Sequence, residues 1–140
     1  MIPKLVRILY VEDQLDIQMI AKMAMTSHGG FEVKACSSGQ EALDAASGFK
    51  PDLLLLDVMM PGMDGPTTLQ KLRLIDETAQ TPAIFFTART DPVDIAKYLA
   101  CGAIDLIPKP FDPMTLAGSI RAIWAWHHLS QIQLSGQATK

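Results

Sequence analysis

The sequence predicts one α/β domain in which a parallel sheet carries helices on both faces. Apolar segments of strand length alternate with amphipathic segments of helical length five times along the 140 residues, as expected for a chain that winds a parallel sheet. Residues 53–56 are four consecutive leucines, which is typical of a strand buried on both faces. Apolar residues make up 49% of the chain and charged residues 19%, so a chain of this size can bury an ordinary core.

The five expected strands share a run of aliphatic, β-branched or aromatic residues that ends in polar or turn-forming residues. In chain order they are residues 5–11, 31–35, 53–57, 83–87 and 103–107. Because each is followed by a helical segment, right-handed crossovers leave few ways to wind the sheet.

The first expected helix follows the first strand and ends at a pair of glycines. Its apolar positions include Leu15 and Met19, its last turn contains His28, and Gly29 and Gly30 end it.

Two sequence signals mark the starts of the second and third expected helices. The capping box of Ser38 with a glutamate three residues later opens the second helix, and Gly65 with Pro66 opens the third.

The last two expected helices have a proline near each start. Asp91 and Pro92 open the fourth helix, which stops at Gly102, and Asp112 and Pro113 open the fifth. One apolar face of the fifth helix contains Leu116, Ile120, Ile123 and Trp124. Residues 129–140 are mostly polar and show no sustained period, so we expect a domain over residues 1–128 followed by a polar tail or the start of a linker.

Charge and composition exclude several classes of protein. The net charge is -3 and the pI about 5.5, and no cluster of Lys and Arg suggests nucleic-acid binding. Lys4 and Arg7 interrupt the apolar residues of the amino terminus, and no apolar run is long enough to cross a bilayer. We therefore expect a cytoplasmic protein without membrane contact. Cys36 and Cys101 lack metal or redox spacing, which favours structural thiols.

Five reactive side chains stand at the carboxyl ends of four expected strands: Glu12 and Asp13, Asp57, Thr87 and Lys109. Ligands bind beyond the carboxyl ends of strands in open α/β sheets. Taken alone, Asp57 suits a turn, Thr87 a strand end and Lys109 a solvated loop. Together they form one candidate site.

Three close carboxylates repel one another unless a cation lies among them. Because the candidate ligands are all oxygens, a hard ion such as Mg²⁺ is expected. A metal, a carboxylate and an ammonium group are the components that phosphoryl transfer needs, with Asp57 as nucleophile and Lys109 neutralising charge.

The sequence resembles the receiver domains of two-component response regulators. The resemblance spans about residues 4–126 and depends on motifs in the family's order and spacing. They are Glu12 with Asp13, DVMMPGMDG from Asp57 to Gly65, Thr87 with Ala88, Gly102 with Ala103 and Asp105, and Lys109 with Pro110 and Phe111.

The resemblance implies a flavodoxin-like (βα)5 fold with strand order 2-1-3-4-5. It also implies that Asp57 accepts a phosphoryl group from a phosphohistidine on a sensor histidine kinase or histidine phosphotransfer protein. Mg²⁺, with Mn²⁺ as the alternative, would be held by Asp13, Asp57, the backbone carbonyl of Met59 and, through water, Glu12. Such a protein catalyses its own phosphorylation and dephosphorylation and is not a conventional enzyme.

The family's switch is implied as well. Lys109 would pair with the phosphate, its bond to Pro110 would be cis, and Thr87 would move toward the phosphate. The output would be a downstream effector or a fused output domain. A homodimer would form through the face made by the fourth helix, fifth strand and fifth helix.

Three positions of this chain bear on how far the switch moves and how long the phosphoryl group lasts, and three aromatic residues bear on partner binding. Leu106 occupies the position where receivers usually carry Tyr, Phe or His, so we expect this face to change shape less than usual. Met59 and Arg89 resemble the variable positions that flank the attacking water and tune the lifetime of the phosphoryl group. Tyr98, Trp124 and Trp126 suit a partner surface, although at least one Trp could equally pack the last helix on the sheet.

Three alternative functions would need different residues at the same positions or no phosphorylation at all. A haloacid dehalogenase-type phosphatase generally needs a second Asp two residues after the nucleophile, where this chain has Met59. A flavodoxin-like nucleotide binder needs a phosphate loop without the charges of Glu12 and Asp13. A receiver-like interaction module that works without phosphorylation remains a third alternative.

Overall fold

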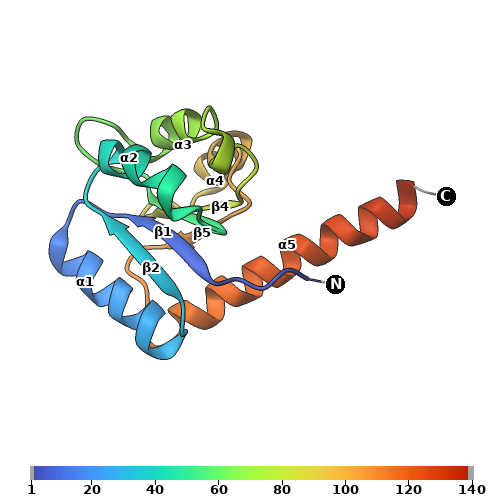
Figure 1. The fold of residues 1–140 in the computed structure, drawn as a ribbon, viewed down its shortest axis with the longest axis horizontal. Helices are drawn as coiled ribbons and strands as arrows, with labels where there is room; N and C mark the ends of the chain where they lie inside the picture. The colour runs from blue at the N-terminus through green and yellow to red at the C-terminus, as the bar shows by residue number, and fades with distance from the viewer. Residues whose placement is uncertain (1, 139–140) are drawn as a thin grey trace.

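The computed structural model describes the backbone of residues 2–138 and the side chains of residues 2–133. Its five parallel strands lie in the order β2-β1-β3-β4-β5, which confirms the predicted fold class (Figure 1). The strands are β1 (Arg7–Val11), β2 (Glu32–Cys36), β3 (Leu53–Asp57), β4 (Ala83–Thr87) and β5 (Asp105–Pro108). The helices are α1 (Leu15–Met23), η1 (Ala24–His28), α2 (Gly39–Phe49), α3 (Gly65–Leu72), η2 (Asp76–Thr78), α4 (Pro92–Ala100) and α5 (Leu116–Ala138).

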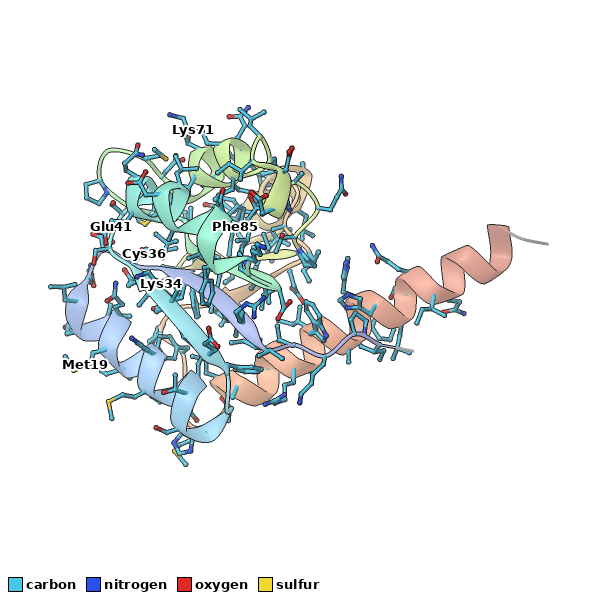
Figure 2. The ribbon with its side chains drawn as sticks, viewed as in Figure 1. Met19, Lys34, Cys36, Glu41, Lys71 and Phe85 are labelled. Carbon is cyan, nitrogen blue, oxygen red and sulfur yellow. The ribbon has the colours of Figure 1, made fainter. Side chains whose placement is uncertain are left out.

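The central strand β3 separates two hydrophobic cores. Leu53 and Leu55 belong to the core under α1 and α5, whereas Leu54 and Leu56 belong to the core under α2, α3 and α4. Figure 1 shows these two helical layers on opposite faces of the sheet. In Figure 2, Phe85 lies within the domain and Met19 points away from α1, in keeping with their 0% and 64% exposure. The unbroken leucine run follows from burial on both faces.

The helix starts follow local capping chemistry. The side chains of Ser38, Asp64 and Asp91 each accept a hydrogen bond from the backbone N–H three residues later, at 2.8–3.1 Å. The capping box is only half formed, because the Glu41 carboxylate accepts from the N–H of Ser37, at 3.2 Å, and not from that of Ser38.

The last helix differs from expectation at both ends. Asp112 does not cap it directly; its carboxylate accepts from the N–H of Met114 at 2.9 Å, and this turn delays the start of α5 to Leu116. Residues 129–138, which the sequence suggested as a polar tail or the start of a linker, continue the helix to Ala138. They contain no proline, and extending an existing helix adds one hydrogen bond for each residue fixed.

The inner half of α5 is fixed to the domain, whereas the outer half stands clear of it (Figure 1). Ile120 and Trp124 lie in the core, and the indole Nε1–H of Trp124 donates to the carbonyl of Pro3 at 2.8 Å. Among the described residues, no helix combines the length and apolar character needed to cross a membrane.

Candidate functional site

The carboxyl ends of four strands bring together the polar residues that the sequence singled out. Glu12 and Asp13 follow β1, Asp57 ends β3, Thr87 ends β4, and Lys109 follows β5. The strands are parallel, so these ends meet at one edge of the sheet. This edge is the candidate site.

Lys109 connects the acidic residues of the site. Its Nζ lies 2.6 Å from Oε1 of Glu12 and 3.1 Å from Oδ1 of Asp57. These are the two ion pairs found in the described part of the chain. The backbone N–H of Lys109 also donates to the carbonyl of Thr87 at 2.9 Å, and the peptide bond to Pro110 is cis. The loop after β5 thus fixes the ammonium group over the ends of β1 and β3.

Burial controls the electrostatics of this group. Glu12 is 0% exposed and Asp57 is 4% exposed. Burial raises the pKa of Glu12 to about 7, against the opposing hydrogen bond from Lys109. Burial lowers the pKa of Lys109, but hydrogen bonds to Glu12 and Asp57 outweigh it, so the net shift is upward. Lys109 therefore remains a cation over the whole physiological pH range.

The acidic cluster has the composition of a hard-cation site. Glu12, Asp13 and Asp57 each offer a carboxylate oxygen, and the three oxygens lie within 4.8 Å of one another. Mg²⁺ and similar ions favour carboxylate oxygens, usually with several waters. Asp13 is only partly buried, which leaves the cluster open to solvent on that side. The residues present fit a divalent cation.

Thr87 lies at the site with its hydroxyl already engaged. Thr87 is only 2% exposed, and its Oγ1 accepts a hydrogen bond from the backbone N–H of Arg89 at 2.9 Å. Arg89 itself is exposed. Met59 is also exposed, at 67%.

The aromatic residues divide between core and surface. Tyr98 packs edge-on against Phe85, with ring centroids 5.8 Å apart, and Trp124 is buried. Trp126 is 73% exposed. Leu106 is partly buried and packs against the core that contains Tyr98. Of the three aromatic residues weighed for a partner surface, only Trp126 is exposed.

Sequence reasoning missed Tyr10, which lies beside the site, and it named Gly65 without giving the close contact that this glycine permits. The hydroxyl of Tyr10 is buried and has no hydrogen-bond partner among the described residues. Burial, with the nearby charges of Glu12 and Asp57, raises the pKa of Tyr10. At Gly65, an added Cβ would overlap the carbonyl oxygen of Asp57. Gly65 belongs to a motif that the sequence showed, whereas Tyr10 appears there only as one more strand residue.

Comparisons with known proteins agree with this geometry. The model of the response regulator receiver domain family matches residues 8–121. The transcriptional regulatory protein CpxR of Klebsiella pneumoniae is 40% identical over 132 residues, which cover 94% of this chain and 55% of that protein. CseB of Streptomyces avermitilis, also named a transcriptional regulatory protein, is 39% identical over 116 residues, or 83% of this chain and 48% of its own length.

The fold has relatives among solved structures. The chemotaxis protein CheY4 of Vibrio cholerae superimposes with a TM-score of 0.79 at 28% identity, covering 86% of this chain and 99% of that structure. A receiver domain of a histidine kinase from Syntrophus aciditrophicus gives a TM-score of 0.71 at 32% identity, covering 86% and 90%. In contrast, this chain spans about half the length of the curated relatives it matches.

Proposed function

This chain belongs to the response regulator receiver domain family, and from that premise we propose that Asp57 is its phosphoacceptor. The observation that carries the proposal is the position of Asp57, whose carboxylate is nearly buried and lies 3.1 Å from the ammonium of Lys109. Two further carboxylates lie within 4.8 Å. No other described carboxylate combines an ion pair to lysine with a place at the carboxyl end of the central strand.

The proposed reaction is phosphoryl transfer from a phosphohistidine. The carboxylate of Asp57 attacks phosphorus, an O–P bond forms, and the P–N bond to the donor imidazole breaks, with the electron pair leaving on that nitrogen. Lys109 neutralises charge on the transferring oxygens. Asp13, Asp57, the backbone carbonyl of Met59 and, through water, Glu12 would hold Mg²⁺ or Mn²⁺, which supplies further neutralisation.

We place the approach of the donor beside Lys109. An apolar hollow of about 420 Å³ opens there between α1 and the loop after β5, and its lining includes Ile17, Ile20, Ala88, Lys109 and Phe111. Response regulators act with histidine kinases, so a sensor kinase or histidine phosphotransfer protein is the proposed donor. This role supports a cytoplasmic location.

The proposed switch begins at Thr87. Its hydroxyl would leave the backbone of Arg89 to bond a phosphate oxygen, and α4, β5 and α5 would present the altered face to an effector, a fused output domain or a second copy. Leu106 offers this face neither a hydroxyl nor a ring. We therefore propose a smaller rearrangement than an aromatic residue would give, and a beryllofluoride-bound structure showing a large one would contradict this.

We propose no role in nucleic-acid contact for these 140 residues, which carry a net charge of -3. The names of the curated relatives describe transcriptional regulators, and any DNA contact in a longer protein would fall to a fused output domain. Met59 and Arg89, both exposed and lying two residues after Asp57 and Thr87 respectively, are proposed to set the lifetime of the phosphoryl group.

Incubation with acetyl phosphate and Mg²⁺, followed by intact mass spectrometry, tests the proposal. We expect one added phosphoryl group that is released by hydroxylamine, is lost in Asp57→Asn and is retained in Asp44→Asn. No uptake with any donor would leave the interaction module that works without phosphorylation. Continuous turnover of phosphomonoesters would instead indicate a phosphatase.

A further inference from the structure

The side of α5 that faces solvent, from Ala122 outward, carries an apolar stripe that the proposed phosphoryl transfer does not use. Leu129 is 50% exposed, Ile132 45% and Trp126 73%, and the smaller Ala122 and Ala125 are exposed and partly buried. We call Ala122, Ala125, Leu129 and Ile132 the α5 seam. Their spacings of three, four and three residues are those of an apolar heptad seam.

The α5 seam lies on the side of the helix away from the domain. At about 100° per residue, Leu129 lies roughly 180° around the helix from Ile120, and Ala122 and Ala125 flank it by about 20–40°. The domain face of α5, which contains Ile120 and Trp124, is already buried in the core. The helix therefore has two opposite apolar faces, and its own chain covers only one of them.

Charge distinguishes among the candidates that could cover the seam. Residues 122–139 contain no Asp, Glu, Lys or Arg. Helices that lie on membrane surfaces usually carry Lys and Arg on their polar face, and a charged partner would find no complementary group here. Identical helices place like residues close together, which costs nothing in an uncharged segment. A second copy of this chain is the occupant that the stripe suits best.

We propose that two copies of this chain associate through the α5 seam. Ala122 and Ala125 let the helices approach closely near the domains, and Leu129 with Ile132 fills the interface farther out. The segment from His128 to Ala138 adds about 15 Å of helix, so the interface is small and we expect a dissociation constant on the order of micromolar or weaker. This association is independent of Asp57 and differs from contact through the face of α4, β5 and α5.

Sedimentation velocity on the full 140-residue chain tests the proposal, over a concentration range of about a hundred-fold around that value. We expect a reversible monomer–dimer equilibrium. Leu129→Asp buries two carboxylates in the seam and should weaken the dimer by about 30-fold or more, whereas Leu129→Met should retain it. Gln131→Asp adds the same charge to the same turn, on an exposed position off the seam, and should change the dissociation constant by less than about 3-fold.

Two measurements distinguish loss of the α5 seam from unfolding of the helix and from dimer contact through α4. Circular dichroism must show unchanged helix content in Leu129→Asp, and phosphoryl uptake from acetyl phosphate must persist, because the domain is untouched. Val93→Asp changes an exposed residue of α4 and should leave the dimer intact. A monomer at every concentration, or a dimer lost in Val93→Asp but kept in Leu129→Asp, would overturn the proposal.

Discussion

The carboxyl edge of the sheet and the outer half of α5 depart from the usual distribution of residues in opposite ways. At the edge, the charged residues Glu12 and Asp57 are almost fully buried. On α5, Leu129, Ile132 and Trp126 are large apolar residues left exposed. Charged groups are rarely buried without a partner, and exposed apolar stripes mark interaction surfaces. The first departure requires a counter-charge, and the second is the surface for which we propose a second copy of the chain.

The two regions differ in what offsets the unfavourable free energy of burying charge or of exposing apolar surface. The buried carboxylates are balanced within the chain, because Lys109 pairs with both Glu12 and Asp57. The α5 seam finds no cover among the described residues. A change at the edge should therefore alter the free energy of unfolding of a single chain, whereas a change at the seam should alter association. Four predictions test this contrast.

Removal of the ammonium group should have the largest effect. Lys109→Met leaves Glu12 and Asp57 buried without their counter-charge, so we expect the free energy of unfolding to fall by about 4 kcal/mol. Urea denaturation at pH 8 without divalent ions measures it. Added Mg²⁺ should restore part of the loss by binding the carboxylates. The matched Lys97→Met, at an exposed lysine, should change stability by less than about 0.5 kcal/mol, and equal effects of the two variants would contradict the contrast.

The pH dependence of stability should show the buried state of Glu12. Its pKa is raised from 4.5 to about 7 in the folded chain, so between these values the folded state holds a proton that the unfolded state has released. Stability without divalent ions should therefore fall as pH rises through this window, by about 3 kcal/mol. Glu12→Gln should lose this dependence and Glu32→Gln, at an exposed position, should retain it. Parallel pH profiles for wild type and Glu12→Gln would contradict the assignment.

The unpaired hydroxyl of Tyr10 should lower the free energy of unfolding by a smaller amount. Tyr10→Phe removes a buried polar atom that has no partner among the described residues, so we expect stabilisation by about 1 kcal/mol. Thermal and urea unfolding both measure it. Tyr98→Phe serves as the control, also with a buried ring, and should change stability by less than about 0.5 kcal/mol. Destabilisation by Tyr10→Phe would mean that the hydroxyl has a partner in solution.

The smallest effect should be found at the seam when the chain is monomeric. Leu129→Ser replaces a half-exposed residue, so unfolding at low protein concentration should change by less than about 0.5 kcal/mol, mostly through helix propensity. Leu55→Ala, in the core, should cost about 2–5 kcal/mol. A large loss for monomeric Leu129→Ser would show that the outer half of α5 packs on its own domain.

Local chemistry explains why so much of the fold was predictable. The consecutive leucines of β3 indicate a strand buried on two faces. Helices begin at Ser38, Asp64 and Asp91 because a side-chain oxygen there accepts a hydrogen bond from a backbone N–H that would otherwise be unpaired. Its position after the fifth expected strand placed Lys109 in the candidate site, but its contacts depend on positions far away in sequence. The bond between Lys109 and Glu12 spans 97 residues, and no local pattern sets its length or burial.

By itself, the sequence determined the alternation of strands and helices, the order of reactive residues along the sheet edge and the family, because periodicity, caps and motifs are local properties. The tertiary structure decided that Tyr98, weighed from the sequence for a partner surface, is buried against Phe85. It also decided that residues 129–138 continue α5. A helix docked along its inner half is already nucleated, and docking depends on the whole sheet.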